Sequence, residues 1–356
     1  NDELVGMLEI GSPNIGDLDT YSISKLQQVM PLFSMAVKRK IEDLSTEVEV
    51  IKQKEFTAIH PTVAWRFNQA AYNLKLKKDT GMDEVMESIV FEDVYPLYGQ
   101  LDIRGSSRER NKSIKQDLQH QLQLAGKIIS SIYEVQPLPI LDELSYRVQK
   151  NLDDIKEGVN AGDEVNILDF IRNEIEVLVA EFEGTDERIN QACALYKEAL
   201  DTDLGIIYNH RKDFEQSLTK INEKVSLFLD QKEAEAQKMF PHYFEKYKTD
   251  GVEFNIYVGD SLTRDRVYSP IYLENLRLWQ LETIAEATIL TEKLRHKLPV
   301  PLQTTQLILV QGSPLSIRFR QDEKQFDVDG AYNIRYEIVK KRIDKAMIKG
   351  TDERLT

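Results

Sequence analysis

Residues 140–156 read ILDELSYRVQKNLDDIK, and the apolar residues of this stretch recur at the spacing of an amphipathic helix. Two further stretches with helical periodicity follow, at residues 164–182 and 187–200. The connectors between the three stretches, at residues 158–162 and 184–186, are short and contain glycine. Because short connectors place neighbouring helices antiparallel, these stretches predict the centre of a helical bundle.

More helices are predicted before this centre. One starts at Ser106 or Ser107, either of which is a good cap residue, and continues to about residue 135. Another spans residues 62–78 and follows His60-Pro61, where proline disfavours helical geometry at the preceding residue. Helical periodicity also covers residues 205–239, so most of residues 59–240 is predicted to form a bundle.

Residues 87–103 (ESIVFEDVYPLYGQLDI) do not fit the helical pattern. Pro96 and Gly99 exclude a regular helix through the middle of this stretch. We therefore expect a buried, irregular connection within the bundle, at residues 87–105.

A long helix is predicted nearer the N-terminus, beginning at Ser22 or Ser24. From Ile41 onward its apolar residues follow steps of three, four and three, which is a heptad seam, while charged residues occupy the other faces. Such a helix can pair with a second copy of itself, so we expect a homo-oligomer held together through long helices. The apolar positions are Leu26, Val29, Phe33, Val37, Ile41, Leu44, Val48 and Ile51.

The pattern changes after residue 240. Residues 252–258, 305–310 and 315–319 are predicted strands, and Gly312-Ser313-Pro314 favours a hairpin between the last two. A helix at residues 270–298 has apolar side chains around much of its circumference, which predicts that it is largely buried, and an amphipathic helix is expected at residues 332–348.

The fold class that these patterns predict is mainly α, a multi-helix bundle with a smaller C-terminal α+β domain. Its expected domains are residues 1–58, with a short strand at residues 4–10 and the long helix, then the bundle at 59–240, then the α+β domain at 241–356.

Composition excludes several classes of protein. The 356 residues carry a formal charge of -14, which opposes binding to nucleic acid and to anionic membranes. The apolar runs are shorter than a membrane span, and no secretory signal is evident, so we expect a cytoplasmic protein. Cys193 is the only cysteine and lies in a helical pattern, where we expect it to be part of the core.

The N-terminal segment resembles the closing portion of a GAF domain, the small-ligand sensor fold of many signalling proteins. The residues that carry the resemblance are VGMLEIG (residues 5–11), LQQV (26–29) and LFSMAV (32–37). In that family a last core strand leads through a loop to a helix that runs out as a coiled-coil connector. The resemblance covers residues 4–50 and implies a regulatory context, but it supplies no binding residues because the elements that enclose the GAF ligand are absent from this sequence.

His60 follows this segment at the place where a sensor histidine kinase would carry its phosphoacceptor. Pro61 comes directly after it, and no glycine-rich nucleotide loop is present, so we favour a histidine that bonds backbone groups at a helix boundary. The five histidines are scattered, without the spacing of metal ligands, and we expect no metal site. No motif indicates a cofactor.

Residues 102–110 (DIRGSSRER) form the most suggestive local feature. Glycine permits an unusual turn here, and the positive end of the following helix, together with several arginines, suits a phosphate or a carboxylate. The alternative is an ordinary helix cap with arginines paired to nearby acids. The anion-binding candidates are Arg104, Gly105, Ser106, Ser107, Arg108 and Arg110.

The aromatic residues just before this loop are candidates for a pocket, although such clusters also form core. The pocket candidates are Phe91, Tyr95, Tyr98 and His60. With no nucleophile or nucleotide motif in the chain, we expect a regulatory, signalling or scaffold module without catalytic activity, which links a sensor-like N-terminal element to the C-terminal α+β domain. The alternative is an enzyme or small-anion-binding protein with its site at residues 102–110.

Overall fold

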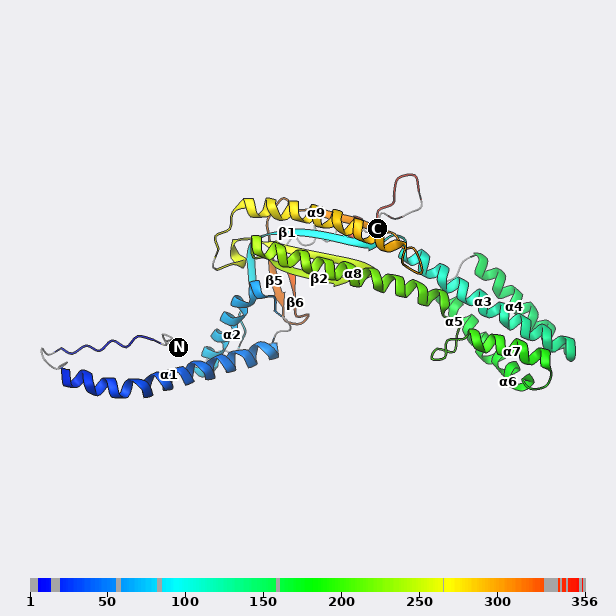
Figure 1. The fold of residues 1–356 in the computed structure, drawn as a ribbon, viewed down its shortest axis with the longest axis horizontal. Helices are drawn as coiled ribbons and strands as arrows, with labels where there is room; N and C mark the ends of the chain where they lie inside the picture. The colour runs from blue at the N-terminus through cyan, green and yellow to red at the C-terminus, as the bar shows by residue number, and fades with distance from the viewer. Residues whose placement is uncertain are drawn as a thin grey trace.

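The computed structural model describes residues 6–13, 20–55, 59–81, 85–157, 161–264, 266–329, 339, 341–343, 345–351 and 354. In these residues the protein is mostly helical with one six-stranded antiparallel sheet, so its overall class is α+β. The molecule is elongated (Figure 1). Helices α1 and α2 lie at one end, the sheet lies in the middle and helices α3 to α7 form the other end.

Strand β1 (Val90–Ile103) is the centre of the sheet. One edge of it pairs with β3 (Gly251–Val258), which in turn pairs with β2 (Tyr243–Lys248). The other edge of β1 pairs with two strands, β4 (Thr304–Val310) along the second half of β1 and β5 (Leu315–Arg320) along its first half. Strand β5 also pairs with β6 (Gln325–Asp329). The irregular connection expected at residues 87–105 is therefore wrong, because this stretch is the longest strand of the sheet described.

The two residues that suggested an irregular segment are each accommodated by the sheet. Pro96 pairs with Tyr257 of β3 but falls between the stretches of β1 that pair with β4 and β5, where its missing N–H leaves no gap in a ladder. Gly99 lies against the ring of Phe254, and a Cβ at this position would overlap that ring. Both residues are thus compatible with a central strand.

The expected hairpin between the last two predicted strands is also wrong. Strands β4 and β5 pair with consecutive parts of β1 and not with each other: Val310 at the end of β4 pairs with Leu97, and Leu315 at the start of β5 pairs with Val94. The connection that contains Gly312 to Pro314 therefore joins two strands that lie one after the other along the same edge of β1. A bulge between Phe91 and Val94, where Asp93 has a φ of 52°, accompanies the change of partner.

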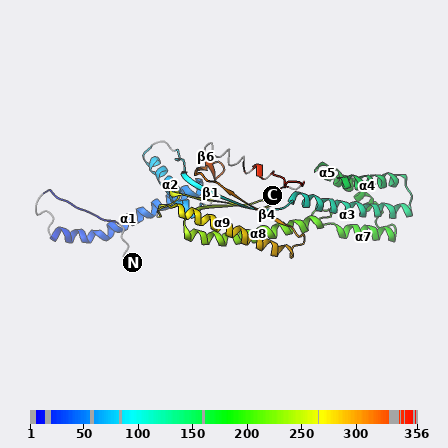
Figure 2. The same cartoon turned by 90° about the horizontal axis from the view of Figure 1, so that it is seen from above.

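Two long helices, α8 (Asn209–Met239) and α9 (Pro270–Arg295), cover one face of the sheet (Figure 2). Their buried residues join Leu97, Leu101 and the apolar residues of β3 in one core. The amide of Gln280 on α9 donates a hydrogen bond to the carbonyl oxygen of Tyr98, at 2.8 Å. One side of α9 is exposed, so the expectation that this helix is largely buried holds for only half of its circumference.

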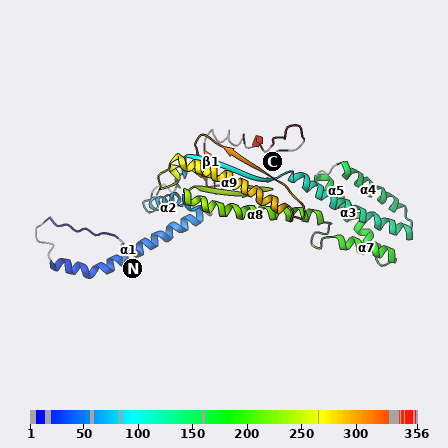
Figure 3. The same ribbon diagram turned by 45° about the horizontal axis from the view of Figure 1, so that its top comes forward.

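The bundle lies between β1 and β2 in the chain. Helix α3 (Ser106–Val135) leaves the end of β1, and α8 returns to the sheet beside it (Figure 3). Between them are α4 (Pro139–Glu157), α5 (Ala161–Phe170), a π-helical turn at Ile171–Ile175, α6 (Glu176–Phe182) and α7 (Glu187–Ala199). These helices have a core of their own, which includes the fully buried Cys193.

A third core lies where α2 (Ala64–Asp79) packs on β5, β6 and the first half of β1. Tyr257 belongs to this core, whereas its neighbour Ile256 belongs to the core under α8 and α9, so the two cores lie on opposite faces of the sheet. Helix α1 (Thr20–Glu55) contacts α2 and extends away from the sheet.

Two further expectations concern the ends of the chain. Met7, Leu8 and Ile10 are exposed and belong to no strand, so the strand expected at residues 4–10 is not formed in its described part, and Leu4 and Val5 lie outside the described residues. Most of the helix expected at residues 332–348 also lies outside them.

Candidate functional site

The predicted arginine-rich loop joins β1 to α3. Gly105 adopts the left-handed conformation with a φ of 64°, and its carbonyl oxygen accepts hydrogen bonds from the backbone N–H groups of Arg108 and Glu109. Helix α3 has no side-chain cap, so the expected capping role of Ser106 or Ser107 is wrong. Ser106 instead donates a hydrogen bond from its hydroxyl to Asp250, at 2.7 Å, because the β2–β3 turn lies beside the loop.

This loop lines a cavity of about 750 Å³. The cavity brings together five of the six anion-binding candidates, while the sixth, Arg110, forms an ion pair with Asp250 at 2.8 Å. Three carboxylates share the lining with the arginines, which lowers the positive potential that an anion would meet. The lining residues are Gln100, Asp102, Ile103, Arg104, Gly105, Ser106, Ser107, Arg108, Thr249, Asp250, Glu253, Met347 and Arg354.

The four aromatic and histidine candidates are not gathered at one place. Phe91 lies in the core beneath α2, and Tyr95 stacks on Tyr268 beside the core under α8 and α9. Tyr98 is buried, and its hydroxyl is 3.0 Å from both Gln100 Oε1 and Glu253 Oε2. They are parts of separate packing clusters, as the core interpretation of these aromatic residues predicts.

His60 is at the helix boundary, as expected of a histidine that bonds backbone groups. Its Nδ1 accepts a hydrogen bond from the backbone N–H of Thr62, and its Nε2 lies 3.6 Å from Glu233 on α8. His242, at the start of β2, is nearby and fully buried, and its Nε2 has no hydrogen-bond partner in the described structure. Burial lowers the pKa of His242, as does His60, while the Phe240 carbonyl and Glu233 oppose that change.

A tyrosine-rich cluster on β2 and β3 was missed in the sequence. Glu245 accepts hydrogen bonds from the Tyr243 hydroxyl and the Asn255 amide, both at 3.1 Å. Burial raises the pKa of Glu245, although hydrogen bonds from Tyr247, Tyr243 and Asn255 oppose the rise. The alternation in YFEKYK (residues 243–248) places these side chains on one face of the sheet and was the signal available in the sequence.

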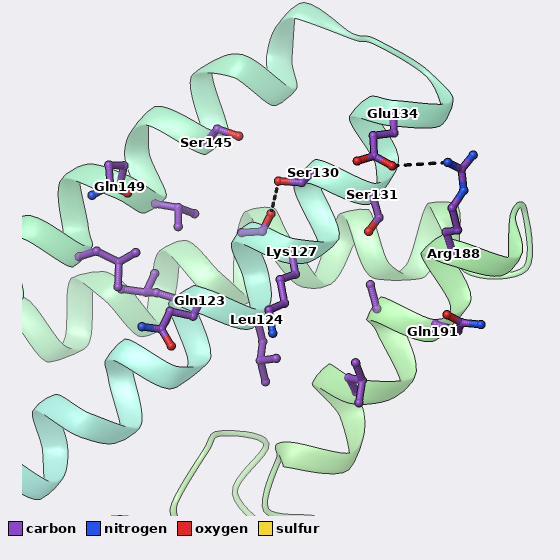
Figure 4. A pocket seen from close by; sticks show the side chains of 16 residues that line it. Gln123, Leu124, Lys127, Ser130, Ser131, Glu134, Ser145, Gln149, Arg188 and Gln191 are labelled. Carbon is purple, nitrogen blue, oxygen red and sulfur yellow. Dashed lines mark hydrogen bonds and ion pairs between the residues drawn. The ribbon is translucent and has the colours of Figure 1, made fainter.

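A groove of about 800 Å³ runs along α3 between α4 and α7. Figure 4 shows Lys127, Ser130 and Ser131 of α3 facing it, with Gln149 on one wall and Gln191 on the other. Arg188 of α7 and Glu134 of α3, 3.4 Å apart, lie at one end. Its lining combines apolar, small and polar side chains, and this mixture did not distinguish it from an ordinary helix surface in the sequence.

Helix α1 carries several large apolar side chains that the rest of the described chain leaves exposed. Val29, Leu32 and Met35 are 55%, 67% and 66% exposed, and Phe33 and Ile41 are also exposed. Farther along the heptad seam, Leu44 and Val48 face α2 and line a cavity together with Trp65, Asn68, Gln69, Tyr72 and Arg264. The second half of the seam is thus partly covered by this chain itself.

Comparison with known proteins adds one similarity. A family model described as "YeeD uncharacterised protein" matches residues 112–225, from the first turns of α3 into α8. The match covers the helical bundle and less than half of the chain. Searches of curated proteins and of solved structures found no match.

Two properties of the described residues bear on the classes of site. No helix among them combines the length and the apolar character needed to span a membrane. Within the same residues, no three His, Cys, Asp or Glu side chains are grouped so as to hold a metal ion.

Proposed function

We propose that this chain is a regulatory or scaffold module that pairs with a second copy through α1. The observation that carries the proposal is the exposure of large apolar residues between Leu26 and Ile41. A helix of this length extends roughly 50 Å, and contiguous exposed apolar surface marks interaction sites. The resemblance of residues 26–37 to the closing helix of a GAF domain supports the proposal, because in that family this helix continues as a connector, whereas the strand that the resemblance also implied at residues 4–10 is not formed in its described part.

A cysteine cross-link tests this pairing directly. Cys193 is fully buried, and burial raises the pKa of its thiol, so an added surface cysteine is the reactive one. Under mild oxidation Phe33→Cys, at a position of the heptad seam, should give a disulfide-linked dimer. A matched control is Ile140→Cys on α4, a position of similar exposure outside α1, which should stay unlinked.

A second pair of changes separates pairing from chance collision. Val29→Glu together with Leu32→Glu places charge on the exposed surface and should abolish the cross-link at residue 33. If neither Phe33→Cys nor Ile41→Cys is cross-linked at micromolar concentration, pairing through α1 is rejected.

A small-anion site is the second candidate, favoured by the cavity that the loop before α3 lines. Its test is calorimetric titration of the full chain with inorganic phosphate. Binding that is lost in Arg104→Gln and kept in Arg188→Gln, an exposed arginine of the bundle, supports this site. If the unaltered protein shows no heat of binding, the small-anion site is rejected.

A further inference from the structure

The cavity at the loop before α3 has two chemically different ends. At the sheet end, Gln100 of β1 pairs with Glu253 of β3 in the register of the strands, and Asp102 lies two residues farther along the same face. At the helix end lie the serines and arginines of residues 104–108. The sheet therefore fixes carboxylates at one end, and the start of α3 fixes hydrogen-bond donors at the other.

Gln100 points to a ligand at the sheet end. The residue is only 9% exposed, and its Oε1 accepts a hydrogen bond from the Tyr98 hydroxyl at 3.0 Å. Its Nε2 donates to no atom of the part of the chain that the structure describes, although the residue lines the cavity. A buried donor of this kind is costly unless a group in the cavity accepts its hydrogen, and a carbonyl oxygen is such a group.

The start of α3 supplies donors at the other end. The carbonyl oxygen of Gly105 accepts from the N–H groups of Arg108 and Glu109, which leaves those of Ser106 and Ser107 for another acceptor, at the positive end of a helix without a side-chain cap. The Arg108 guanidinium lies beside them, since a Cβ on Gly105 would be 3.4 Å from its Nη2. Both kinds of donor suit a carboxylate.

The charges along the cavity are balanced and separated. Three arginines and three carboxylates line its described part. One of these carboxylates, Asp250, is held at the helix end by Ser106 and Arg110, at 2.7 and 2.8 Å. The other two, Asp102 and Glu253, are at the sheet end. A simple anion is therefore attracted to one end and repelled by the other, whereas a ligand with one positive and one negative end matches both.

The distance between the two ends indicates the length of such a ligand. Gln100 lies three residues before the end of β1, which is about 10 Å along a strand. The charged groups of an extended tripeptide with free termini are also about 10 Å apart. Its peptide groups supply the carbonyl oxygen that the Gln100 amide lacks, and a volume of about 750 Å³ is in the range of small-ligand pockets.

We propose that this cavity binds a short peptide with free termini. The ammonium group of the peptide lies at Glu253 and Asp102, its first carbonyl oxygen accepts from Gln100, and its carboxylate meets the N–H groups at the start of α3 and the Arg108 guanidinium. The proposal rests on the second candidate function above, a ligand site at this cavity, and replaces a simple anion by a ligand that carries two charges.

Calorimetric titration of the full chain tests the proposal with four probes: triglycine, N-acetyltriglycine, triglycine amide and glycine. Triglycine should bind. Each of the others should bind about tenfold more weakly or worse, because each lacks one charge or the separation between the charges. An absence of triglycine binding overturns the proposal, and so does N-acetyltriglycine that binds as tightly as triglycine. The titration with inorganic phosphate described above decides separately whether a simple anion site exists.

Variants test which end holds which charge. Glu253→Gln should weaken triglycine binding about tenfold and leave N-acetyltriglycine binding unchanged, whereas Arg108→Gln should weaken both about tenfold. The matched control is Glu143→Gln on α4, an exposed carboxylate outside the cavity, which should bind triglycine as the unaltered protein does. Asp102→Asn repeats the test at the sheet end if circular dichroism shows that Glu253→Gln is unfolded. Unchanged triglycine binding in a folded variant of the sheet end overturns the proposal.

Discussion

Asp117 of α3 and Arg211 of α8 form a buried ion pair, with Nε and Oδ2 3.2 Å apart and Asp117 completely inaccessible to solvent. The same carboxylate accepts hydrogen bonds from the backbone N–H groups of His210 and Arg211, in the first turn of α8. Asp117 of α3 thereby caps the N-terminus of α8. Arg211 also contacts Glu164 of α5 at 2.6 Å, so three helices meet at this point.

Asp117→Ala should destabilise the protein by about 3 kcal/mol, because it leaves the Nε–H of Arg211 and two buried backbone N–H groups without their acceptor, while the same guanidinium keeps its pair with Glu164. Denaturant unfolding followed by circular dichroism measures the change. The matched control is Asp153→Ala, whose exposed pair with Lys156 should be worth at most about 1 kcal/mol. Equal losses in the two variants would show that Asp117 is not a structural cap.

Gly99→Ala should cost about 1–3 kcal/mol of stability, because its Cβ would overlap the ring of Phe254 inside the core. Thermal unfolding measures the loss, and adding Phe254→Leu should recover part of it by making room. Gly312→Ala serves as the control, since nothing lies within 4 Å of a Cβ there. No loss at Gly99, or no recovery in the double variant, contradicts this account of the close contact.

The buried His242 makes stability sensitive to acid. Its pKa is lowered in the folded protein, chiefly by burial, so between that value and the ordinary 6.5 the unfolded chain binds more protons than the folded one. Stability therefore falls as the pH is lowered through this window. Glu233 and His60 are the titratable groups that face His242.

His242→Gln should flatten the dependence of stability on pH below neutrality, measured as the melting temperature at a series of pH values. His296→Gln, at the exposed end of α9, should keep the slope of the unaltered protein. Parallel slopes in all three proteins would assign the acid sensitivity to other groups.

Glu245 should act in the opposite direction. Burial raises its pKa above the ordinary 4.5, so the folded protein binds more protons than the unfolded chain between these two values, and stability falls as the pH rises through that window. The loss of stability caused by ionising Glu245 then persists at higher pH. Glu245→Gln, which cannot ionise, should gain stability relative to the unaltered protein as the pH rises from 4 toward neutrality, measured by denaturant unfolding. A constant difference would contradict a raised pKa.

Local periodicity predicted the helices well and the strands less well. Apolar residues recur every three to four positions in the bundle helices. Helix α4, with Leu141 and Leu144 in the core, matches the predicted stretch closely. β1 was missed because Pro96 and Gly99 are helix and strand breakers unless particular neighbours accommodate them. Those neighbours, Tyr257 and Phe254, are distant in the sequence.

The candidate sites divide in the same way, into one that has a local sequence pattern and others that form only through tertiary packing. The loop before α3 was found because glycine, serine and arginine are adjacent in the chain, and the structure places five of the six named residues around one cavity. The groove between α4 and α7, the Asp117 cap and the cluster around Glu245 were not found. Each depends on side chains brought together by tertiary packing, for which a single sequence contains no local pattern.

The placement of the bundle between β1 and β2 also affects how the chain reaches its fold. Leu101 pairs with Val252, yet every residue of the bundle lies between these two partners along the chain. Joining two such distant strands while the intervening chain is unfolded carries a large loop-closure entropy. Once α3 and α8 lie side by side, the ends of β1 and β2 are neighbours. The bundle should therefore fold before the sheet, and damage to helices α4 to α7 should slow the closure of a sheet whose core those helices do not share.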